Sequence, residues 1–333
     1  MAKLLISDVI QPPVWVPYLR QMAIKLNRML RSGIVVPNPT LQDKLKGGGQ
    51  PFINMPNWNP LTGVSQVLSD SVPLSVSGIG KAKQIAYCLA RGDARSVNDL
   101  AGIRSGDDPA RAIAETWAQW WNEDEQAILI ATLSGIIADN KANDSSDLVS
   151  SIATEDGDNA QATNKLSGSA VINAAQKMGD AKGKLAAIVM HSQIEANLAT
   201  LDQITTVRDS EGKILYNAYK GLEVITDDTV PVRVGTTSGH VYTTYLAARG
   251  AVSRADYIPT ENGVEFDRDI LAGDTVMTMR RHLVLHPTGY AAAYAANALA
   301  GDTAANTELD DAAAWDRVWD RKNTGIVAIE SNG

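Results

Sequence analysis

The stretch DDPARAIAETWAQWWNEDEQAILIATLSGIIADNK, residues 107–141, decides the fold. Its apolar residues recur every three to four positions, which predicts one long helix over residues 108–141. Asp108 is a suitable N-cap, and Pro109 stands where a first-turn proline is tolerated. At 1.5 Å per residue the helix would span roughly 50 Å, longer than a compact domain usually needs. We therefore expect a spine with other elements arranged along it, or a helix shared between subunits.

The composition disfavours several classes of protein. The chain has 333 residues, 44% hydrophobic and 20% charged, so it can bury a globular core in one large or two ordinary domains. Its formal net charge of −8 disfavours binding to nucleic acid through the phosphates. Cys88 is the only cysteine, so neither a disulfide nor a cysteine-based zinc site can form within one chain. We find no membrane-spanning run and no signal peptide, and we expect a protein of a reducing cytoplasm.

The first 46 residues predict an arm. Prolines interrupt its start, and residues 16–31 then carry apolar side chains at helical spacing. The polar face of this helix carries Arg20 and Arg28, in the most basic part of the chain. The helix is either a solvated amphipathic helix or an arm that binds a partner.

Residues 47–84 predict a long two-stranded loop that stands away from a core. The run PFINMPNWNPLTG (51–63) is dense in Pro and Asn. Residues 72–77 alternate apolar and polar, which indicates a strand, and Pro73 places it at an edge because proline donates no hydrogen bond to a ladder. Long loops without their own core usually have a function, here contact with another chain. Two short helices are predicted to follow, at 81–91 and 96–101.

The rest of the chain combines helices and strands. Residues 142–165 are polar, acidic and small, which predicts an exposed loop. Residues 166–235 alternate helix and strand, which favours a small mixed sheet. Residues 236–333 are mainly β. The expected helices are 169–178 and 192–202, and the expected strands are 185–190, 222–226, 230–234, 241–248, 276–285 and 326–329. Residues 213–219 are either a strand or a turn.

Candidate catalytic groups are few. The run 179–185 resembles a phosphate loop, but its spacing is wrong and it precedes a strand instead of following one. His191, with Ser192 or Ser169 and with Asp227, could serve an α/β hydrolase-like enzyme, although no GxSxG turn is present. Asp227 and Asp228 could also be paired acids or metal ligands, but we prefer to explain them as a turn after a strand.

Metal-ligand candidates are equally few. The chain has four histidines. His282 and His286 share a face of a predicted strand, but that spacing is too wide for a tight chelate. We expect satisfied or surface histidines and therefore predict no catalytic, cofactor or metal site.

The order of parts and several local phrases carry a resemblance to a known family. The phrases are PFINMPNW (51–58), LTG (61–63), GDDP (106–109), AIVMHS (187–192), YKGLEVITDD (219–228), VP (230–231), HPTG (286–289), NTEL (306–309), Trp315 and KNTGIV (322–327). In this order, over nearly the whole chain, they resemble the major capsid proteins of tailed bacteriophages, which have the Hong Kong ninety-seven type of fold.

The resemblance implies an α+β fold with five parts. They are an N-terminal arm (1–46), an extended β-hairpin loop (47–84), a first peripheral segment with the spine helix (85–164), an axial α/β domain (165–235) and a β-rich second peripheral segment (236–333). It further implies that Trp117, Trp120 and Trp121 pack on the β-rich part. The wider apolar end of the helix, near 127–137, would be covered by the axial part or by a neighbour.

The resemblance also implies a function and partners. The chain would be a structural coat protein that assembles in pentamers and hexamers into an icosahedral shell around packaged double-stranded DNA. The residues expected at subunit contacts are Phe52, Asn54, Trp58 and Pro73 of the loop, with Arg20 and Arg28 of the arm. Because the arm is too short to be a scaffold, we expect a separate scaffolding protein.

Further expectations concern the other partners and the location. We expect a portal protein, only non-specific proximity to DNA and no membrane, and a decoration protein is an optional further partner. The chain would belong to the virion capsid and assemble in the host bacterial cytoplasm. Two alternatives remain: the hydrolase-like enzyme described above, and an encapsulin-like shell of a cellular compartment with the same fold.

Overall fold

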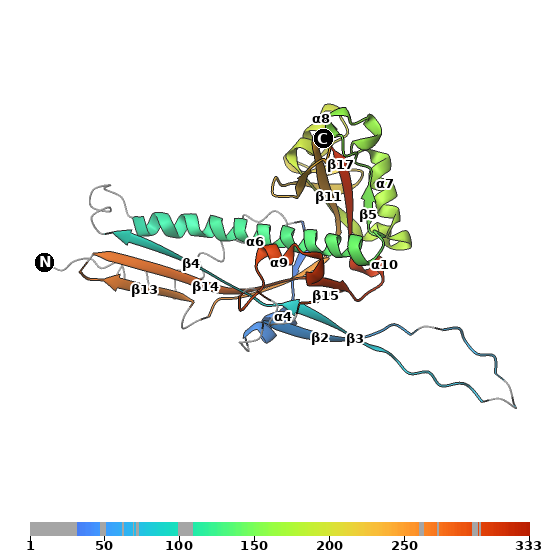
Figure 1. The fold of residues 1–333 in the computed structure, drawn as a ribbon, viewed down its shortest axis with the longest axis horizontal. Helices are drawn as coiled ribbons and strands as arrows, with labels where there is room; N and C mark the ends of the chain where they lie inside the picture. Colours follow the sequence, from blue (N-terminus) through green and yellow to red (C-terminus); the bar gives the residue numbers. More distant parts are fainter. Residues whose placement is uncertain are drawn as a thin grey trace.

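The computed structural model describes residues 32–46, 51–61, 63–68, 70, 73–98, 109–259, 263–271, 273–294, 299 and 301–333. Within them a long helix runs between two main sheets, and a hairpin projects from the body (Figure 1). The predicted helix at 16–31, with Arg20 and Arg28, and the predicted N-cap Asp108 lie outside these residues.

The spine is helix α6, Pro109–Asn143, which has 35 residues. The prediction of one long helix is confirmed. Its tryptophans also pack as expected, because Trp117 and Trp121 are buried with Met277 and Met279 of the same chain. Lys141 stands in the last turn, where a positive charge suits the negative end of the helix dipole.

A five-stranded sheet, here called the peripheral sheet, lies on one side of α6 (Figure 1). Its strands are β1 (Val35–Pro37), β12 (Val252–Tyr257), β14 (Asp274–Pro287), β13 (Val264–Asp269) and β4 (Leu89–Asn98). Strand β14 is central: β4 pairs with it along one edge, and β13 and β12 share the other edge, all antiparallel. Parallel pairing joins β1 to β12.

The hairpin consists of β2 (Phe52–Trp58) and β3 (Lys81–Tyr87), paired antiparallel along their whole length. The predicted two-stranded loop is therefore confirmed, but its strands are placed differently. Residues 73–80 form no strand, so the predicted strand at 72–77 is wrong in its described part. The predicted helices at 81–91 and 96–101 are wrong as well, because their described residues lie in β3 and β4 or join them. Pairing with distant strands outweighs the weak helical spacing of these short runs.

An eight-stranded sheet, here called the axial sheet, lies on the other side of α6 (Figure 1). Its order is β5-β17-β11-β6-β9-β8-β7, and β10 pairs with β11. The bounds are β5 (Val149–Ser151), β6 (Leu185–Met190), β7 (Thr205–Arg208), β8 (Ile214–Tyr219), β9 (Leu222–Thr226), β10 (Val232–Val234), β11 (His240–Ala248) and β17 (Ile326–Asn332).

Most of the predicted axial elements are present. Helices α7 (Gly168–Gln176) and α8 (Ser192–Thr200) pack on one face of the axial sheet, and α6 packs on the other. Three strands come from outside the predicted range 165–235, namely β5, β11 and β17. Strand β5 also lies in a stretch that we predicted to be loop. The sheet thus crosses the predicted segment boundaries, and the division into five parts stays a prediction.

Short elements complete the body. They are α4 (Pro39–Lys46), α9 (Asn306–Leu309), α10 (Arg321–Thr324), β15 (Tyr290–Ala292), β16 (Trp315–Arg317) and the 3-10 turns Gly157–Asn159, Ala162–Asn164, Gly179–Lys184 and Ala312–Ala314. The start of α4 is marked in the sequence by Asn38 and Pro39. Asn38 caps it, because its Oδ1 accepts from Thr40 N at 3.1 Å, and Pro39 follows in the first turn.

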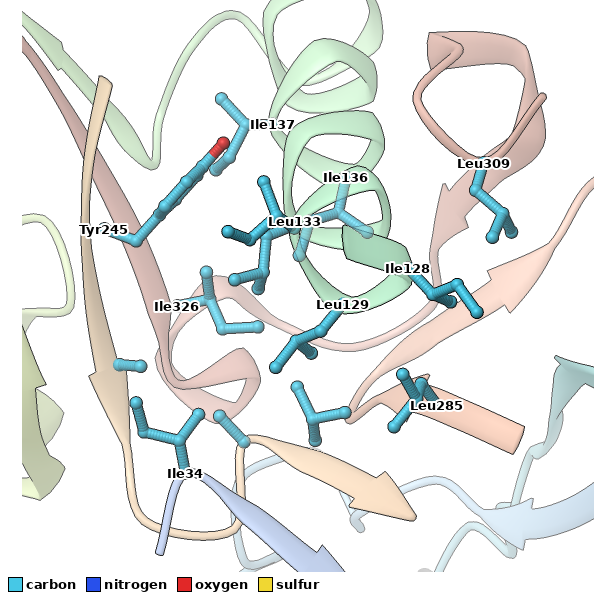
Figure 2. Packing of buried hydrophobic residues seen from close by; sticks show 14 of the residues in the cluster. Ile34, Ile128, Leu129, Leu133, Ile136, Ile137, Tyr245, Leu285, Leu309 and Ile326 are labelled. Atoms are coloured by element: carbon cyan, nitrogen blue, oxygen red, sulfur yellow. The ribbon is translucent and has the colours of Figure 1, made fainter. Parts of the chain in front are cut away.

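The largest core surrounds the second half of α6 (Figure 2). Leu133 of the helix is buried with Val189 and Ile225, which lie within the predicted axial part. Tyr245 from the axial sheet and Leu285 from the peripheral sheet belong to the same core. The expectation that the axial part covers the wider apolar end of the helix is therefore confirmed. One helix binds the two sheets into a single body.

Candidate functional site

The projecting hairpin carries an unusual surface. Beyond its paired base, the described arm residues 59–61, 63–68 and 73–80 run extended (Figure 1), and their large apolar side chains face solvent. The exposed residues are Leu61, Val64, Val67, Leu68, Leu74, Val76 and Ile79. Val76 is 98% exposed and Val67 is 94% exposed, as in an unfolded chain. Contiguous apolar exposure of this kind marks interaction sites.

The base of the hairpin is anchored to the body. Phe52 lies 5.5 Å from the ring of Tyr87, whose hydroxyl donates to the Ala314 carbonyl at 2.7 Å. Lys44 of α4 donates to the Asn54 carbonyl at 2.8 Å. Burial raises the pKa of the Tyr87 hydroxyl to about 12, so it remains a hydrogen-bond donor. The loop therefore extends from a fixed base.

One backbone hydrogen bond and one glutamine side chain hold the two arms together without a regular ladder. Asn59 N donates to the Gly80 carbonyl at 2.9 Å, next to the last strand pair. Farther out, the Gln66 side-chain amide donates to the Ser75 carbonyl and accepts from Ser75 N, both at 2.8 Å. One side chain thus imitates a backbone pair, and it keeps the arms extended where solvent surrounds them.

The predicted contact residues occupy different environments. Phe52 is half-buried against the core, so at least part of its surface serves the anchor. Trp58 is 61% exposed, with the Lys81 ammonium 5.2 Å from its ring centroid. Asn54 and Pro73 are exposed. Whether any of them touches a neighbour stays a prediction, and the more exposed valines and leucines of the arms were missed. Their signal was large apolar side chains among Gly, Pro and Ser.

A buried charged group lies beneath the middle of α6. Glu125 accepts from Arg254 through two hydrogen bonds of 2.5 and 2.9 Å, and it lies 3.5 Å from Arg281. Arg281 stacks over Trp121 at 4.6 Å, and Arg254 also reaches Asp256 at 3.1 Å. Desolvation lowers the pKa of Arg281 despite the nearby carboxylates. These residues bind the helix to β12 and β14. Glu125 neutralises Arg254 directly, whereas Nε and Nη2 of Arg281 are buried without a hydrogen-bond partner among the described residues.

The structure does not assemble the hydrolase-like candidates. Ser192 is held by Asp228, whose Oδ1 accepts from Ser192 N at 3.0 Å and whose pKa is lowered chiefly by the Ser192 side chain. His191 Nδ1 caps α8 by accepting from Gln193 N at 3.1 Å. Asp227 instead accepts from Thr229 and from Gln126 of α6. Ser169 bonds to Ser167 at 3.0 Å.

The described residues contain no cluster of three or more His, Cys, Asp or Glu side chains that could hold a metal ion. His282 stacks with Tyr257, and His286 Nε2 donates to Gln84 Oε1 at 3.0 Å. The phosphate-loop-like run forms a 3-10 turn in front of β6, with Lys182 bound to Gln176 at 3.0 Å. Among the helices that the structure describes, none is long and apolar enough to cross a membrane.

Comparisons with known proteins agree with this arrangement. The chain is 36% identical to the major capsid protein of Bacillus phage SPP1 over 331 residues, which cover 99% of this chain and 98% of that protein. No family model matches the sequence.

Solved capsid structures share the fold. The capsid of Ralstonia phage GP4 has a TM-score of 0.57 at 10% identity and covers 86% of this chain and 84% of that one. The capsid of cyanophage Pam1 also has a TM-score of 0.57, at 11% identity, with 87% of each chain covered. An empty GTA particle gives 0.53 at 13% identity, covering 92% and 90%.

The level of identity over the full length and the shared α+β architecture lead to one assignment, and neither favours the enzyme reading. The chain belongs to the major capsid proteins of tailed bacteriophages and is a structural protein of the virion shell.

Proposed function

We propose that this chain closes an icosahedral shell around packaged double-stranded DNA by laying its hairpin loop on a neighbouring copy. The observation that carries the proposal is the loop itself, with seven exposed large apolar side chains on two extended arms. A free monomer gains nothing from such a surface. Heterologous contacts of one chain with the next close into rings, which is the geometry of pentamers and hexamers.

The energy of this contact is substantial. Fully burying one Val or Leu side chain contributes roughly 1.5–3 kcal/mol. Val64, Val67 and Val76 are each more than nine-tenths exposed, so nearly all of that contribution is available on assembly. Part of it offsets the lost freedom of the arms. Because each single contact is weak, a misplaced subunit can dissociate and bind again before the shell closes.

A shortened loop tests the proposal. Because Asn59 and Gly80 are hydrogen-bonded at 2.9 Å, residues 60–79 can be replaced by an Asn-Gly turn that closes the hairpin. We expect the variant subunit to unfold as cooperatively as the wild type and to form no particles in electron micrographs. Normal particles from this variant would refute the role of the loop.

The matched control keeps the loop and changes an exposed polar residue in it. Ser65→Ala removes one hydroxyl from the same arm and is expected to assemble normally. A third variant, Val67→Asp with Val76→Asp, preserves the loop length and replaces two apolar contacts by charges. We expect it to fold and to lose assembly, because buried unpaired carboxylates are costly.

The proposal includes helper proteins and a location. A separate scaffolding protein guides curvature, a portal protein occupies one vertex, a decoration protein binds outside, and assembly takes place in the host bacterial cytoplasm. The net charge of −8 supports a wall that does not bind the packaged DNA tightly. Expression of this chain alone in bacteria tests the scaffold: we expect irregular assemblies, whereas uniformly sized closed shells would refute it.

A further inference from the structure

We infer that a notch in the axial sheet receives the opposite edge of the axial sheet of a second copy of this chain, packed head to tail. This inference rests on the proposed shell function and names the contact that would close each ring. The notch lies between β8 and β9 and has a volume of about 890 Å³. Ile214, Leu215 and Tyr216 line it on one side, and Val224 and Thr226 on the other.

The notch exists because two strands of one sheet separate. Strands β8 and β9 pair only at Ala218–Glu223 and Tyr219–Leu222. Beyond that point β8 pairs with β7 alone, so the rest of the β7–β8 hairpin leaves the sheet. Residues 224–226 of β9 pair with β6 on one side only. Both walls therefore present strand edges that need water or a partner.

The separated hairpin has apolar residues that nothing in the described chain covers. Ile214 is 55% exposed, Leu215 58% and Tyr216 41%. Leu201, just before the hairpin, is 63% exposed. A two-stranded ribbon with uncovered apolar residues is marginal by itself in water. Its apolar side chains are better explained by a surface that becomes buried on assembly.

The opposite edge of the axial sheet offers a complementary surface. Helix α7 packs on β17 and β5, which form the other end of the strand order. Its outward face carries Ile172, which is 58% exposed. Lys177, Lys182 and Lys184 follow along the same edge. One surface of each copy is thus a notch, and the other is an exposed Ile beside lysines.

Charge favours the same pairing. Glu195 and Glu223 line the notch, and Arg249 is its single base. Two acids lie beside the lysines of the α7 edge. Asp180 is paired with Lys322 at 2.9 Å, and Asp320 lines the same hollow as Lys184, so Lys177, Lys182, Lys184 and Lys322 outnumber them. The notch is therefore net acidic and the α7 edge net basic. Complementary charges of this kind orient two copies head to tail and disfavour like edges.

The direction of the hairpin loop agrees with this arrangement. In Figure 1, α7 and β5 lie on the side of the molecule toward which the β2–β3 loop projects. A neighbour that receives the loop therefore stands on the α7 side. In a ring of copies related by rotation, each copy presents opposite edges to its two neighbours. The neighbour on the α7 side would therefore present its β7–β8 edge to α7. Loop and notch would then contact neighbours in the same ring.

A paired-cysteine experiment tests the contact. Ile172→Cys and Leu215→Cys are combined in one chain, particles are assembled under reducing conditions, and oxidised glutathione is then added. A head-to-tail contact should give a ladder up to pentamers and hexamers on a non-reducing denaturing gel. Each single variant should stay monomeric. The natural Cys88 does not compete, because burial raises the pKa of its thiol to about 11.

The outcomes separate this inference from the proposed function. Normal particles without a ladder would overturn the contact and leave the shell function intact, whereas a wild-type chain that forms no particles would overturn the shell function. A second measurement needs no variant. Hydrogen exchange at 214–217, 224–226 and 172–184 should slow at least tenfold in wild-type particles relative to free subunits. Unchanged exchange at either edge would overturn the inference.

Discussion

The first half of α6 rests on one sheet, whereas the second half is enclosed by two. Trp117 and Trp121 cover the peripheral sheet, and Glu115 and Gln119 on the far side of the helix face solvent. From Ile128 onward, both sheets contact the helix and nearly every turn is buried. Between the halves lies the charged group around Glu125. The same helix therefore extends the subunit at its N-terminal end and forms the centre of the main core at its C-terminal end.

The largest effect is expected at the charged group that divides the two halves. Glu125→Ala leaves Arg254 and Arg281 buried without their main counter-charge, which should cost about 3–5 kcal/mol of unfolding free energy. Urea denaturation of unassembled subunits measures this loss. Glu123→Ala, two residues earlier on the exposed face, is the control and should change stability by less than about 0.5 kcal/mol. A small loss at Glu125 would mean that water reaches the arginines.

The enclosed half should respond more strongly to lost apolar volume than the one-sided half. Leu133 is 1% exposed, and Leu133→Ala should cost about 2–5 kcal/mol. Ile113 is only half-buried at the peripheral sheet, and Ile113→Ala should cost about 1 kcal/mol, because less apolar area is lost. Equal losses in thermal unfolding would show that the two halves are equally packed.

His286, a buried side chain away from α6, should make the stability of the subunit depend on pH. Burial lowers the pKa of His286 from 6.5 to about 4. Below about pH 6.5 the unfolded chain binds a proton that the folded chain does not, so stability is full above this pH and falls as the pH approaches 4. The loss should reach about 3 kcal/mol.

His286→Gln should flatten the pH dependence between pH 6.5 and 4, although it also lowers stability at neutral pH. The variant keeps a side chain that can donate to Gln84, whose Oε1 also accepts from Gly289 N at 3.1 Å. The control is His240→Gln, an exposed histidine, which should follow the wild-type curve. If both variants retain the wild-type slope, His286 does not cause it.

The smallest effect concerns a close contact within the enclosed half. A Cβ on Gly135 would overlap the Leu309 carbonyl oxygen and lie 2.7 Å from Trp315 Nε1. Gly135→Ala should therefore destabilise by about 1–2 kcal/mol, although alanine is the better helix former by about 1 kcal/mol. Gly183→Ala has open space around it and should be neutral or slightly stabilising. A stabilised Gly135→Ala variant would mean that α9 moves freely.

The candidate surface was predictable only in outline. Pro, Asn and Gly in 47–84 indicated a projecting loop, and the structure confirms a hairpin there. The sequence pattern singled out Phe52, which instead packs against the core at the base, and passed over Val67 and Val76, the most exposed valines among the described residues. Exposure cannot be read from residue type, because a valine in a core strand and one on a loop have the same local pattern.

Local hydrogen bonding explains which elements the sequence alone determined. A helix bonds each residue to one four positions away, so the periodicity of 108–141 was sufficient to predict α6. The strands at β6, β9, β11 and β17 were also recognisable, since continuous or alternating apolar runs are typical of half-buried and buried strands.

Tertiary structure alone decided the pairing. Residues 89–98 form β4 because β14, nearly two hundred positions later, offers them a partner, although their own sequence predicted the end of one short helix, a turn at Gly92 and the start of another. The same holds for Glu125 with Arg254 and Arg281, whose charges meet only after two strands have been brought under the helix. Strand partners and buried ion pairs are contacts between residues far apart in the sequence. The local sequence therefore does not reveal which residues will pair, and only the folded chain brings them together.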